Sequence, residues 1–548
     1  MKINKLFPPT LLLLSQAVFA AQPPTAGSQL QQIPRSPIQQ RDAPKTELQP
    51  IATSAETMNE SVRINVSTLR ITGAQAYSES ELLAETGFVA NSQLSLADLR
   101  GMAAKIANYY HRNGYFVAQA YLPPQNIQNG VVTIAVIDGR YGSITLRNQS
   151  KVNDALANDL LGGLNSGDPV TAEPLESRLL LLSDLPAVQV SSTLVAGVAP
   201  GTSDLIVDLA PGNRISGSVD ADNAGNRYTG EYRVGATINF NEPIGQGDVA
   251  TLRAMTSGPG MDYVRGSYQL QFGRAKVGVA YSHLNYELQR EFASLQAHGT
   301  AKVASIYGSY PLIRSRNNNL YVGLAYDAKT FQDKQDSTAS VTDKEANVVM
   351  ASLYGDHRDN FGGGGVSAYS FTWSAGEIYI QTLGALVIDA ATARSNGNYN
   401  KFGYSLMRSQ SLTDSLSLYA SINGQLASKN LDVSEKMELG GMYAVRAYPE
   451  GEAYADEGYV LNLELRKQMT RELQLVGFVD SGTVKANRNP WAAGANRRTL
   501  SGAGIGMVWS RANDLVIRAY YAMKLGNEAA TSAPDKSGRF WIQIVKYF

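Results

Sequence analysis

Apolar and polar residues alternate along the C-terminal part of the chain, residues 211–548, and this pattern restricts the fold more than any other feature. Clear examples are "DYVRGSYQLQFG" (262–273), "SLSLYASINGQL" (415–426) and "YVLNLELR" (459–466). A period of two is that of a β-strand, and segments of about 9–11 residues of this kind are typical of a transmembrane barrel. About sixteen such segments fit the region. We predict a membrane β-barrel of about 16 antiparallel strands with an aqueous lumen, because a soluble two-sheet sandwich would need far fewer residues.

The N-terminus has the composition of a secretory signal peptide, which we expect over residues 1–20. Lys2 and Lys5 precede the apolar "LFPPTLLLLS", and "AVFA" provides a loose cleavage site after Ala20. The apolar run is too short to span a bilayer as a helix, and no run of about 20 apolar residues follows it. Residues 21–60 are rich in Pro, Gln, Ser and Thr, which predicts a linker with one short helix at Ser28–Ile33.

Residues 61–140 and 141–210 are predicted to form two small domains of one architecture, each with the order β-α-α-β-β. The first contains "VRINVSTLRITG" as a strand and "SLADLRGMAAKIANYYHRNGY" as its main helix, where Ser95 and Asp98 match a capping box. The second repeats this order from "GSITLRN" to "SDLIVDLAPG". Such a tandem repeat predicts binding or spacing rather than catalysis.

Composition and motifs give no support for an enzyme, a cofactor or a metal. The chain has no cysteine, which excludes disulfides and thiolate metal sites, and its four histidines are scattered. "GAGIGM" (502–507) precedes no predicted helix, and "GGGG" (362–365) lacks the Lys-Ser/Thr of a phosphate loop. Lys+Arg and Asp+Glu both number 48, so no charge excess indicates nucleic-acid binding.

Several phrases carry a resemblance to a known family. Two βααββ units before a barrel resemble a pair of polypeptide-transport (POTRA) domains, and the whole chain resembles the two-partner secretion transporters. This TpsB family exports haemolysins, filamentous haemagglutinins and contact-dependent inhibition toxins. The phrases are residues 108–139, residues 222–235, "VRAYPEGE" (445–452) and "FVDSG" (478–482). The last strand, "GRFWIQIVKYF", resembles the C-terminal signal of outer-membrane barrels, with Lys546 where an apolar residue is usual.

The resemblance implies a loop, about 430–455, that folds into the barrel lumen. Its tip, V-R-G-Y/F in the family, corresponds to Val445, Arg446, Ala447 and Tyr448, and the partner motif F-x-D-x-G on the barrel wall to Phe478, Asp480 and Gly482. Alternation independently places Asp480 on the lumen face, opposite Leu475 and Val479. An arginine can bind such a carboxylate bidentately, which would hold the loop as a latch.

Two positions need separate interpretation. Ala447 stands where the family has glycine, which would restrict the backbone there if φ were positive. Arg265, in "VRGSY" (264–268), imitates the tip motif but lies within a clean alternating strand, so we interpret it as an ordinary lumen-facing residue.

The resemblance further implies an outer-membrane translocase. Its POTRA domains would recognise a large unfolded exoprotein of the haemolysin, adhesin or contact-dependent toxin type in the periplasm, by β-augmentation, and the barrel would export it. The N-terminal helix and the folded-in loop would occupy the resting pore. We expect a monomer in contact with outer-membrane lipid. The alternatives are a barrel-assembly insertase and a diffusion porin or receptor.

Overall fold

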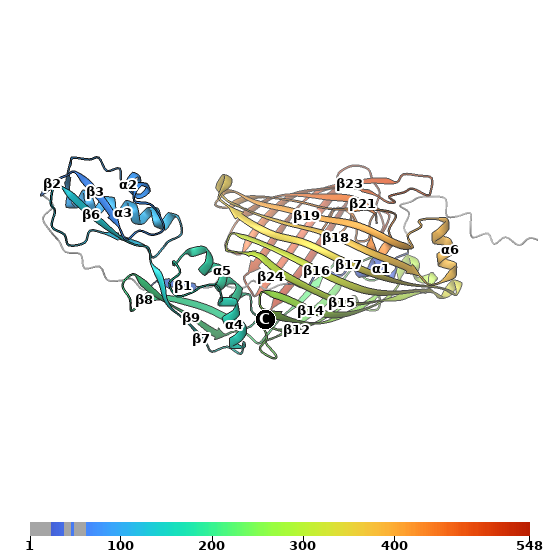
Figure 1. The fold of residues 1–548 in the computed structure, drawn as a ribbon. Coiled ribbons are helices and arrows are strands. Elements are labelled where there is room, and N and C mark those ends of the chain that lie inside the picture. Colours follow the sequence, from blue (N-terminus) through green and yellow to red (C-terminus); the bar gives the residue numbers. More distant parts are fainter. Residues whose placement is uncertain (1–22, 38–44, 49–61) are drawn as a thin grey trace, which may run out of the picture.

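The computed structural model describes residues 23–37, 45–48 and 62–548, so the expected signal peptide lies outside the described part of the chain. Two small α/β domains and one long barrel follow one another along the molecule (Figure 1). In the part of the chain that is described, no helix is both long and apolar enough to cross a membrane.

The first α/β domain has two helices and five strands around one core. Its elements are β2 (Arg63–Val66), β3 (Thr68–Thr72), α2 (Glu79–Thr86), β4 (Ser92–Ser95), α3 (Leu96–Arg112), β5 (Gln119–Tyr121) and β6 (Val131–Ile137). The strands form a sheet in the order β3-β6-β5 and a separate pair β2-β4. The Ser95 hydroxyl accepts a hydrogen bond from the Asp98 N–H at 3.1 Å, and the Asp98 carboxylate accepts one from the Ser95 N–H at 2.9 Å. This reciprocal cap determines where α3 begins.

The second α/β domain has the predicted order β-α-α-β-β, to which the first domain adds β2 and β4, and it gains one strand from the linker. Its elements are β7 (Arg140–Asn148), α4 (Asp154–Leu161), α5 (Ala172–Ser183), β8 (Val188–Ala196) and β9 (Thr202–Pro211). The additional strand, β1 (Lys45–Leu48), pairs in parallel with β8, which gives the sheet order β1-β8-β9-β7.

Sixteen antiparallel strands, β10 to β25, form one closed barrel. Its strands are β10 (Ile215–Asp222), β11 (Arg233–Asn241), β12 (Val249–Thr256), β13 (Met261–Phe272), β14 (Ala275–Glu287), β15 (Ala297–Arg314), β16 (Asn318–Gln335), β17 (Ser340–Asp359), β18 (Gly365–Ile380), β19 (Gly397–Thr413), β20 (Leu416–Ala427), β21 (Glu457–Gln468), β22 (Leu473–Lys485), β23 (Arg497–Arg511), β24 (Leu515–Lys524) and β25 (Gly538–Tyr547). Pairing of β10 with β25 closes the ring. The barrel confirms the predicted fold class.

Outward-facing apolar side chains remain exposed in the isolated chain, as Ile505 (71%) and Leu324 (63%) illustrate. Such a surface suits lipid, whereas many inward-facing side chains are polar or charged. At the end far from the α/β domains lie short helices: α6 (Leu383–Ala391) and the 3₁₀ turns Arg290–Leu295 and Asp336–Thr338.

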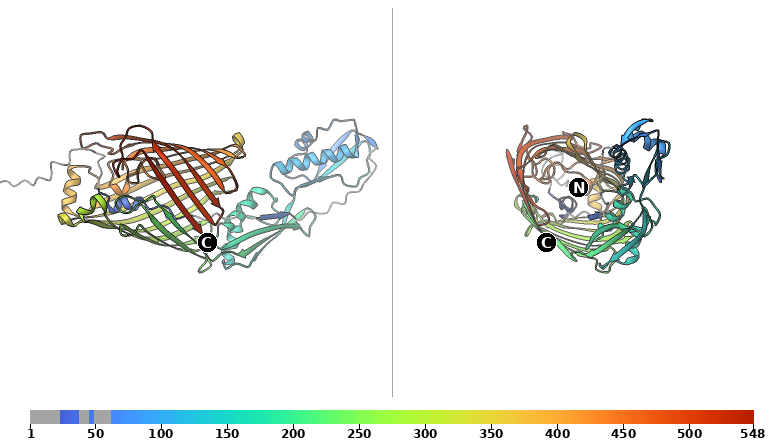
Figure 2. Two further views of the ribbon diagram at one scale, coloured as in Figure 1. Left: turned by 180° about the vertical axis from the view of Figure 1, so that it is seen from behind. Right: turned by 90° about the vertical axis from the view of Figure 1, so that its left-hand side faces the viewer.

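The second α/β domain is docked on the barrel through side-chain and backbone contacts. Arg314, at the end of β15, binds Asp184 bidentately, with Nε and Nη2 at 2.8 and 2.9 Å from the two carboxylate oxygens. The Asn153 N–H donates to the Gly245 carbonyl at 2.8 Å. The left view in Figure 2 shows this domain against the end of the barrel. These contacts hold it beside the mouth of the lumen.

Candidate functional site: a loop tip held on the barrel wall

The connection between β20 and β21, residues 428–456, folds back into the barrel. Its tip is buried: Val445, Ala447 and Tyr448 are 0% exposed and Arg446 is 4% exposed. Tip residues pack with side chains of the barrel wall such as Val476, Phe478 and Leu500. The position of the tip therefore depends on contacts with β21 to β23.

Arg446 and Asp480 form the central contact of the site. The Arg446 Nε and Nη2 donate to Asp480 Oδ2 and Oδ1 at 2.8 and 2.7 Å, and the Arg446 backbone N–H donates to Oδ2 at 3.1 Å. Asp480 is completely buried on the inner face of β22, while Leu475 and Val479 of the same strand face outward. One carboxylate thus binds both the side chain and the backbone of the tip, which defines its register on the wall.

Further groups of the barrel wall surround the Arg446 guanidinium. Its Nη1 lies 2.8 Å from a Glu464 oxygen, and its carbon lies 3.5 Å from the centre of the Phe478 ring. Asn462 donates to both Asp480 Oδ1 and the Ala444 carbonyl, at 2.8 and 2.9 Å. The Trp541 indole donates to the Arg446 carbonyl at 2.7 Å. The buried charges of Arg446, Asp480 and Glu464 are tolerated here because each charged group is paired with an opposite charge or a hydrogen-bonding neighbour.

Small residues allow the loop to approach the wall. A Cβ on Gly502 would lie 2.5 Å from the Ala447 Cβ, and one on Gly482 would lie 2.3 Å from the Leu439 side chain. Ala447 itself is not among the residues with positive φ, so alanine is accommodated there without backbone strain. The Tyr448 hydroxyl donates to the Glu528 carbonyl at 3.0 Å, which connects the tip to the loop between β24 and β25.

Glu452 is a second anchor that sequence reasoning missed. It is 0% exposed, and its carboxylate lies beside Arg498 of β23. It accepts hydrogen bonds from the backbone N–H and the hydroxyl of both Thr531 and Ser532, at 2.7 to 3.0 Å. Its place at the end of "VRAYPEGE" is the only signal that could have drawn attention to it.

Three lysines hold the part of the loop that precedes the tip. Glu435 pairs with Lys329 and Lys401, at 2.7 and 2.8 Å, and Asp432 pairs with Lys344 at 2.8 Å. The lysines come from β16, β17 and β19, which lie six, five and three strands from β22 around the ring. The loop is therefore attached to strands spread around the ring and not to β21, β22 and β23 alone.

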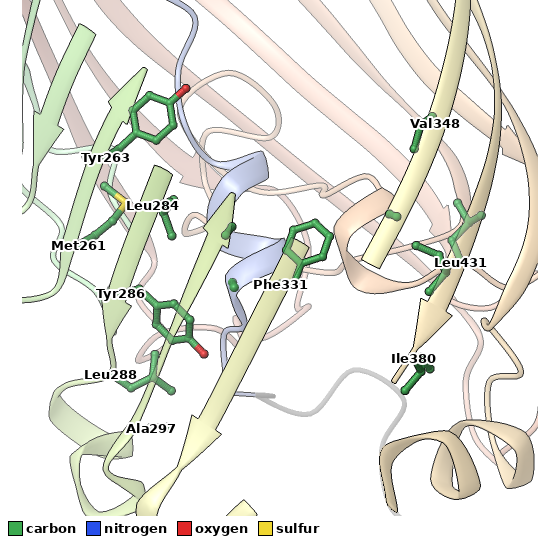
Figure 3. Packing of buried hydrophobic residues seen from close by; sticks show 14 of the residues in the cluster. Met261, Tyr263, Leu284, Tyr286, Leu288, Ala297, Phe331, Val348, Ile380 and Leu431 are labelled. Atoms are coloured by element: carbon green, nitrogen blue, oxygen red, sulfur yellow. The ribbon is translucent and has the colours of Figure 1, made fainter. Parts of the chain in front are cut away.

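The helix α1 (Ala26–Gln31) also lies within the barrel and contacts this loop. It begins two residues before the predicted Ser28–Ile33, because the Thr25 side chain forms a capping box with Ser28. Gln31 donates to the Val433 carbonyl at 3.1 Å, and a Cβ on Gly27 would lie 2.7 Å from the Ser434 Cβ. Figure 3 shows α1 among wall residues that include Tyr286 and Phe331.

The sequence VRGSY (264–268), which imitates the tip motif, lies on the barrel strand β13. Arg265 is on the inner side of β13, between Tyr263 and Ser267, while Val264 faces outward at 48% exposure. Its position agrees with the interpretation as a strand residue of the lumen wall.

The sequence matches a known protein family and a known domain. Residues 201–508 match the family described as haemolysin secretion/activation protein ShlB/FhaC/HecB, and residues 64–139 match the ShlB-type POTRA domain. The heme/hemopexin transporter protein HuxB of Haemophilus influenzae is 29% identical over 470 residues, which are 83% of this chain and 82% of HuxB. The outer membrane transporter CdiB of Dickeya dadantii is 22% identical over 68% of this chain and 67% of its own.

Solved structures share the fold. CdiB from Escherichia coli superposes with a TM-score of 0.67 at 19% identity, covering 91% of this chain and 93% of CdiB. BamA from Haemophilus ducreyi lacking POTRA domains 1–3 superposes with a TM-score of 0.55 at 15% identity, covering 88% of this chain and 100% of the BamA chain. Because the family match covers more than half of the sequence, the chain belongs to the haemolysin secretion/activation protein family ShlB/FhaC/HecB and is an outer-membrane transporter of the two-partner secretion type.

Proposed function

We propose that this transporter exports one large exoprotein through its barrel and that α1 and the loop of residues 428–456 close the lumen until the exoprotein arrives. The Arg446–Asp480 contact is the observation that carries this proposal. It joins a loop tip to the wall through side chains and one backbone N–H, so it can open without unpairing any strand of the barrel. A lumen occupied by α1 and this loop is expected of a gated export pathway. A diffusion porin needs an open lumen.

An apolar groove on the first POTRA domain supports entry of an unfolded chain from the periplasm. The groove has a volume of about 1100 Å³ and is lined mainly by aliphatic and proline residues, among them Ile64, Leu99, Leu122 and Ile127. Such a surface can bury apolar segments of an unfolded polypeptide. The cargo is therefore proposed to be a polypeptide of the haemolysin, adhesin or contact-dependent toxin type.

Export of a co-expressed partner exoprotein tests the proposal. In cells that express both proteins, we expect export to need this chain and to fall at least tenfold when Asp480→Ala opens the contact. If the chain is dispensable for export but its loss impairs assembly of other barrels, the insertase is the correct function.

Channel recordings test the closure by α1. In planar bilayers, Gly27→Val should raise the conductance, because the new side chain cannot fit against Ser434 and α1 must leave its place. Currents that are equally large in the unmodified protein, together with normal export in Asp480→Ala, would indicate a porin.

A further inference from the structure

The turn between β11 and β12, residues 242–248, carries two buried carboxyl groups. Glu242 is 2% exposed and Asp248 is 0% exposed. The Glu242 N–H donates to the Asp248 carbonyl at 2.8 Å, which closes the turn on itself. Glu242 has a φ of 53°, in the left-handed region that residues other than glycine seldom adopt. The fold therefore holds the two carboxyl groups together at a strained position of the backbone.

The hydrogen bonds of these two carboxyl groups are unequal. Asp248 accepts hydrogen bonds from two backbone N–H groups of the turn, at 2.9 and 3.2 Å, and from the Tyr268 hydroxyl at 2.6 Å. Glu242 accepts one through its Oε2, from the Gly247 N–H at 3.2 Å, and its Oε1 is buried without a hydrogen-bond partner. A carboxyl group in such a place is suited to carry a proton, because its neutral form can donate to the adjacent carboxylate.

The same turn is where the barrel contacts the second POTRA domain. The Gly245 carbonyl accepts the hydrogen bond from the Asn153 N–H at 2.8 Å. A Cβ on Gly245 would lie 2.4 Å from the Lys151 carbonyl oxygen, and one on Gly247 would lie 3.0 Å from the Leu185 side chain. A change in the charge of the carboxyl pair therefore acts on atoms that touch the POTRA domain.

The other charged groups near this contact are engaged elsewhere. Arg314 binds Asp184 bidentately, and the Lys276 Nζ donates to the Asp184 carbonyl at 3.4 Å. On the POTRA side, Lys151 touches the turn through its carbonyl oxygen, and Asp159 lies beside the turn between β13 and β14. In the part of the chain that the structure describes, no ion pair includes either carboxyl group of the 242–248 turn. A proton is thus the simplest means of reducing their combined charge.

We propose that Glu242 and Asp248 make this contact a proton-dependent joint, which holds the second POTRA domain on the barrel while Glu242 is protonated and loosens when Glu242 loses its proton. This inference concerns regulation of the domain contact and does not depend on what passes through the barrel. With one proton on the pair, the turn remains closed. With both groups charged, two buried like charges repel each other, and the turn must open toward water.

The direction of the pH effect follows from the two states of the turn. In the closed turn, burial and the neighbouring Asp248 raise the pKa of Glu242 to about 7. In an open, hydrated turn the pKa of a glutamate is about 4.3. The closed turn binds more protons between these values, so acid favours closure. Closure is strongest below about pH 4.3 and weakens as pH rises to about 7.

Hydrogen exchange of the full chain in detergent, resolved to single residues, measures this opening. The amide to follow is that of Asn153, whose hydrogen bond to Gly245 breaks when the turn moves away from the POTRA domain. After correction for the intrinsic pH dependence of exchange, we expect its protection to fall at least tenfold from about pH 5 to about pH 7.5. Amides between β8 and β9 of the same domain should keep their protection. Equal protection of Asn153 at the two pH values overturns the inference.

Glu242→Gln identifies the group that titrates, because its amide keeps the shape of the neutral carboxyl group and can donate to Asp248. Asn153 should then be protected equally at both pH values. Asp159→Asn is the matched control, since it removes another carboxylate at the same joint and should keep the full pH response. A tenfold loss that persists in Glu242→Gln overturns the inference, as does protection restored at about pH 7.5 by calcium. The first measurement uses the unsubstituted chain, so it decides the matter even if a variant does not fold.

Discussion

Arg446 and Asp480 are separated by 34 positions in the chain, yet one carboxylate binds the guanidinium and the backbone N–H of the other residue. The three hydrogen bonds leave little rotational freedom to the tip. Glu464 and Phe478 then confine the guanidinium from two other directions. The loop is consequently held in one register on β22.

Removal of either partner should release this register. We expect Arg446→Ala and Asp480→Ala each to lower export, because the remaining buried charge loses a partner at a cost of about 3–5 kcal/mol. The double variant should export as much as the single variant with the lower export, since both substitutions break the same contact. A double-mutant cycle of export, with protease sensitivity of the loop as a second readout, checks this.

Arg265→Ala is the matched control, because Arg265 also lines the lumen but belongs to a strand. Arg265→Ala should leave the protease sensitivity of the loop unchanged. Independent, additive losses for Arg446→Ala and Asp480→Ala would show that the two residues do not act as one contact.

Gly502 should tolerate no side chain while Ala447 is present. The new Cβ of Gly502→Ala would lie 2.5 Å from the Ala447 Cβ, and crowding of this kind costs about 1–3 kcal/mol. We expect lower export and a lower unfolding temperature, with partial recovery in Gly502→Ala/Ala447→Gly. Gly477→Ala is the control, because a Cβ there has nothing within 4 Å. If Ala447→Gly does not restore export in Gly502→Ala, the new Cβ clashes with a residue other than Ala447.

Glu452 should hold the loop between β24 and β25, residues 525–537. Both of its carboxylate oxygens accept hydrogen bonds, whereas the amide of Glu452→Gln has only one acceptor oxygen and no charge for Arg498. We expect cleavage of residues 525–537 by external protease to become at least fivefold faster.

Glu528→Gln provides the comparison, since Glu528 also faces Arg498 but its side chain is 58% exposed. It should change the cleavage rate little. Equal effects of the two substitutions would argue against an anchoring role for the buried carboxylate.

The α3 cap should make the first POTRA domain sensitive to acid. Hydrogen bonds from the backbone and hydroxyl of Ser95 lower the pKa of Asp98. A lowered carboxyl pKa contributes stability above the unfolded value, about 3.9, which is lost as pH falls through the lower folded value. Hydrogen exchange on the full chain should show loss of α3 protection in that acid range. Asp98→Asn should weaken protection above this acid range and remove the acid step; an unchanged step would assign it to another group.

Alternation along the chain was sufficient to predict the barrel and the inward direction of Asp480. Both follow from local physics, because a period of two must place one face on lipid and the other in the lumen. Capping residues likewise predicted the start of α3 at Ser95. The start of α1 was predicted two residues too late, because the cap formed by Thr25 and Ser28 was not recognised in the linker composition.

The partners of the loop could not be obtained in the same way. Motif resemblance suggested Arg446 with Asp480, but nothing local relates Arg446 to Glu464 or Glu452 to Ser532, because these pairs meet only after sixteen strands have closed into one ring. The same holds for β1, whose four residues have weak strand propensity and pair with β8 only because the folded POTRA domain presents an open edge. Sequence by itself determined which faces point inward, and the closed barrel and the docked domains decided which residues meet there.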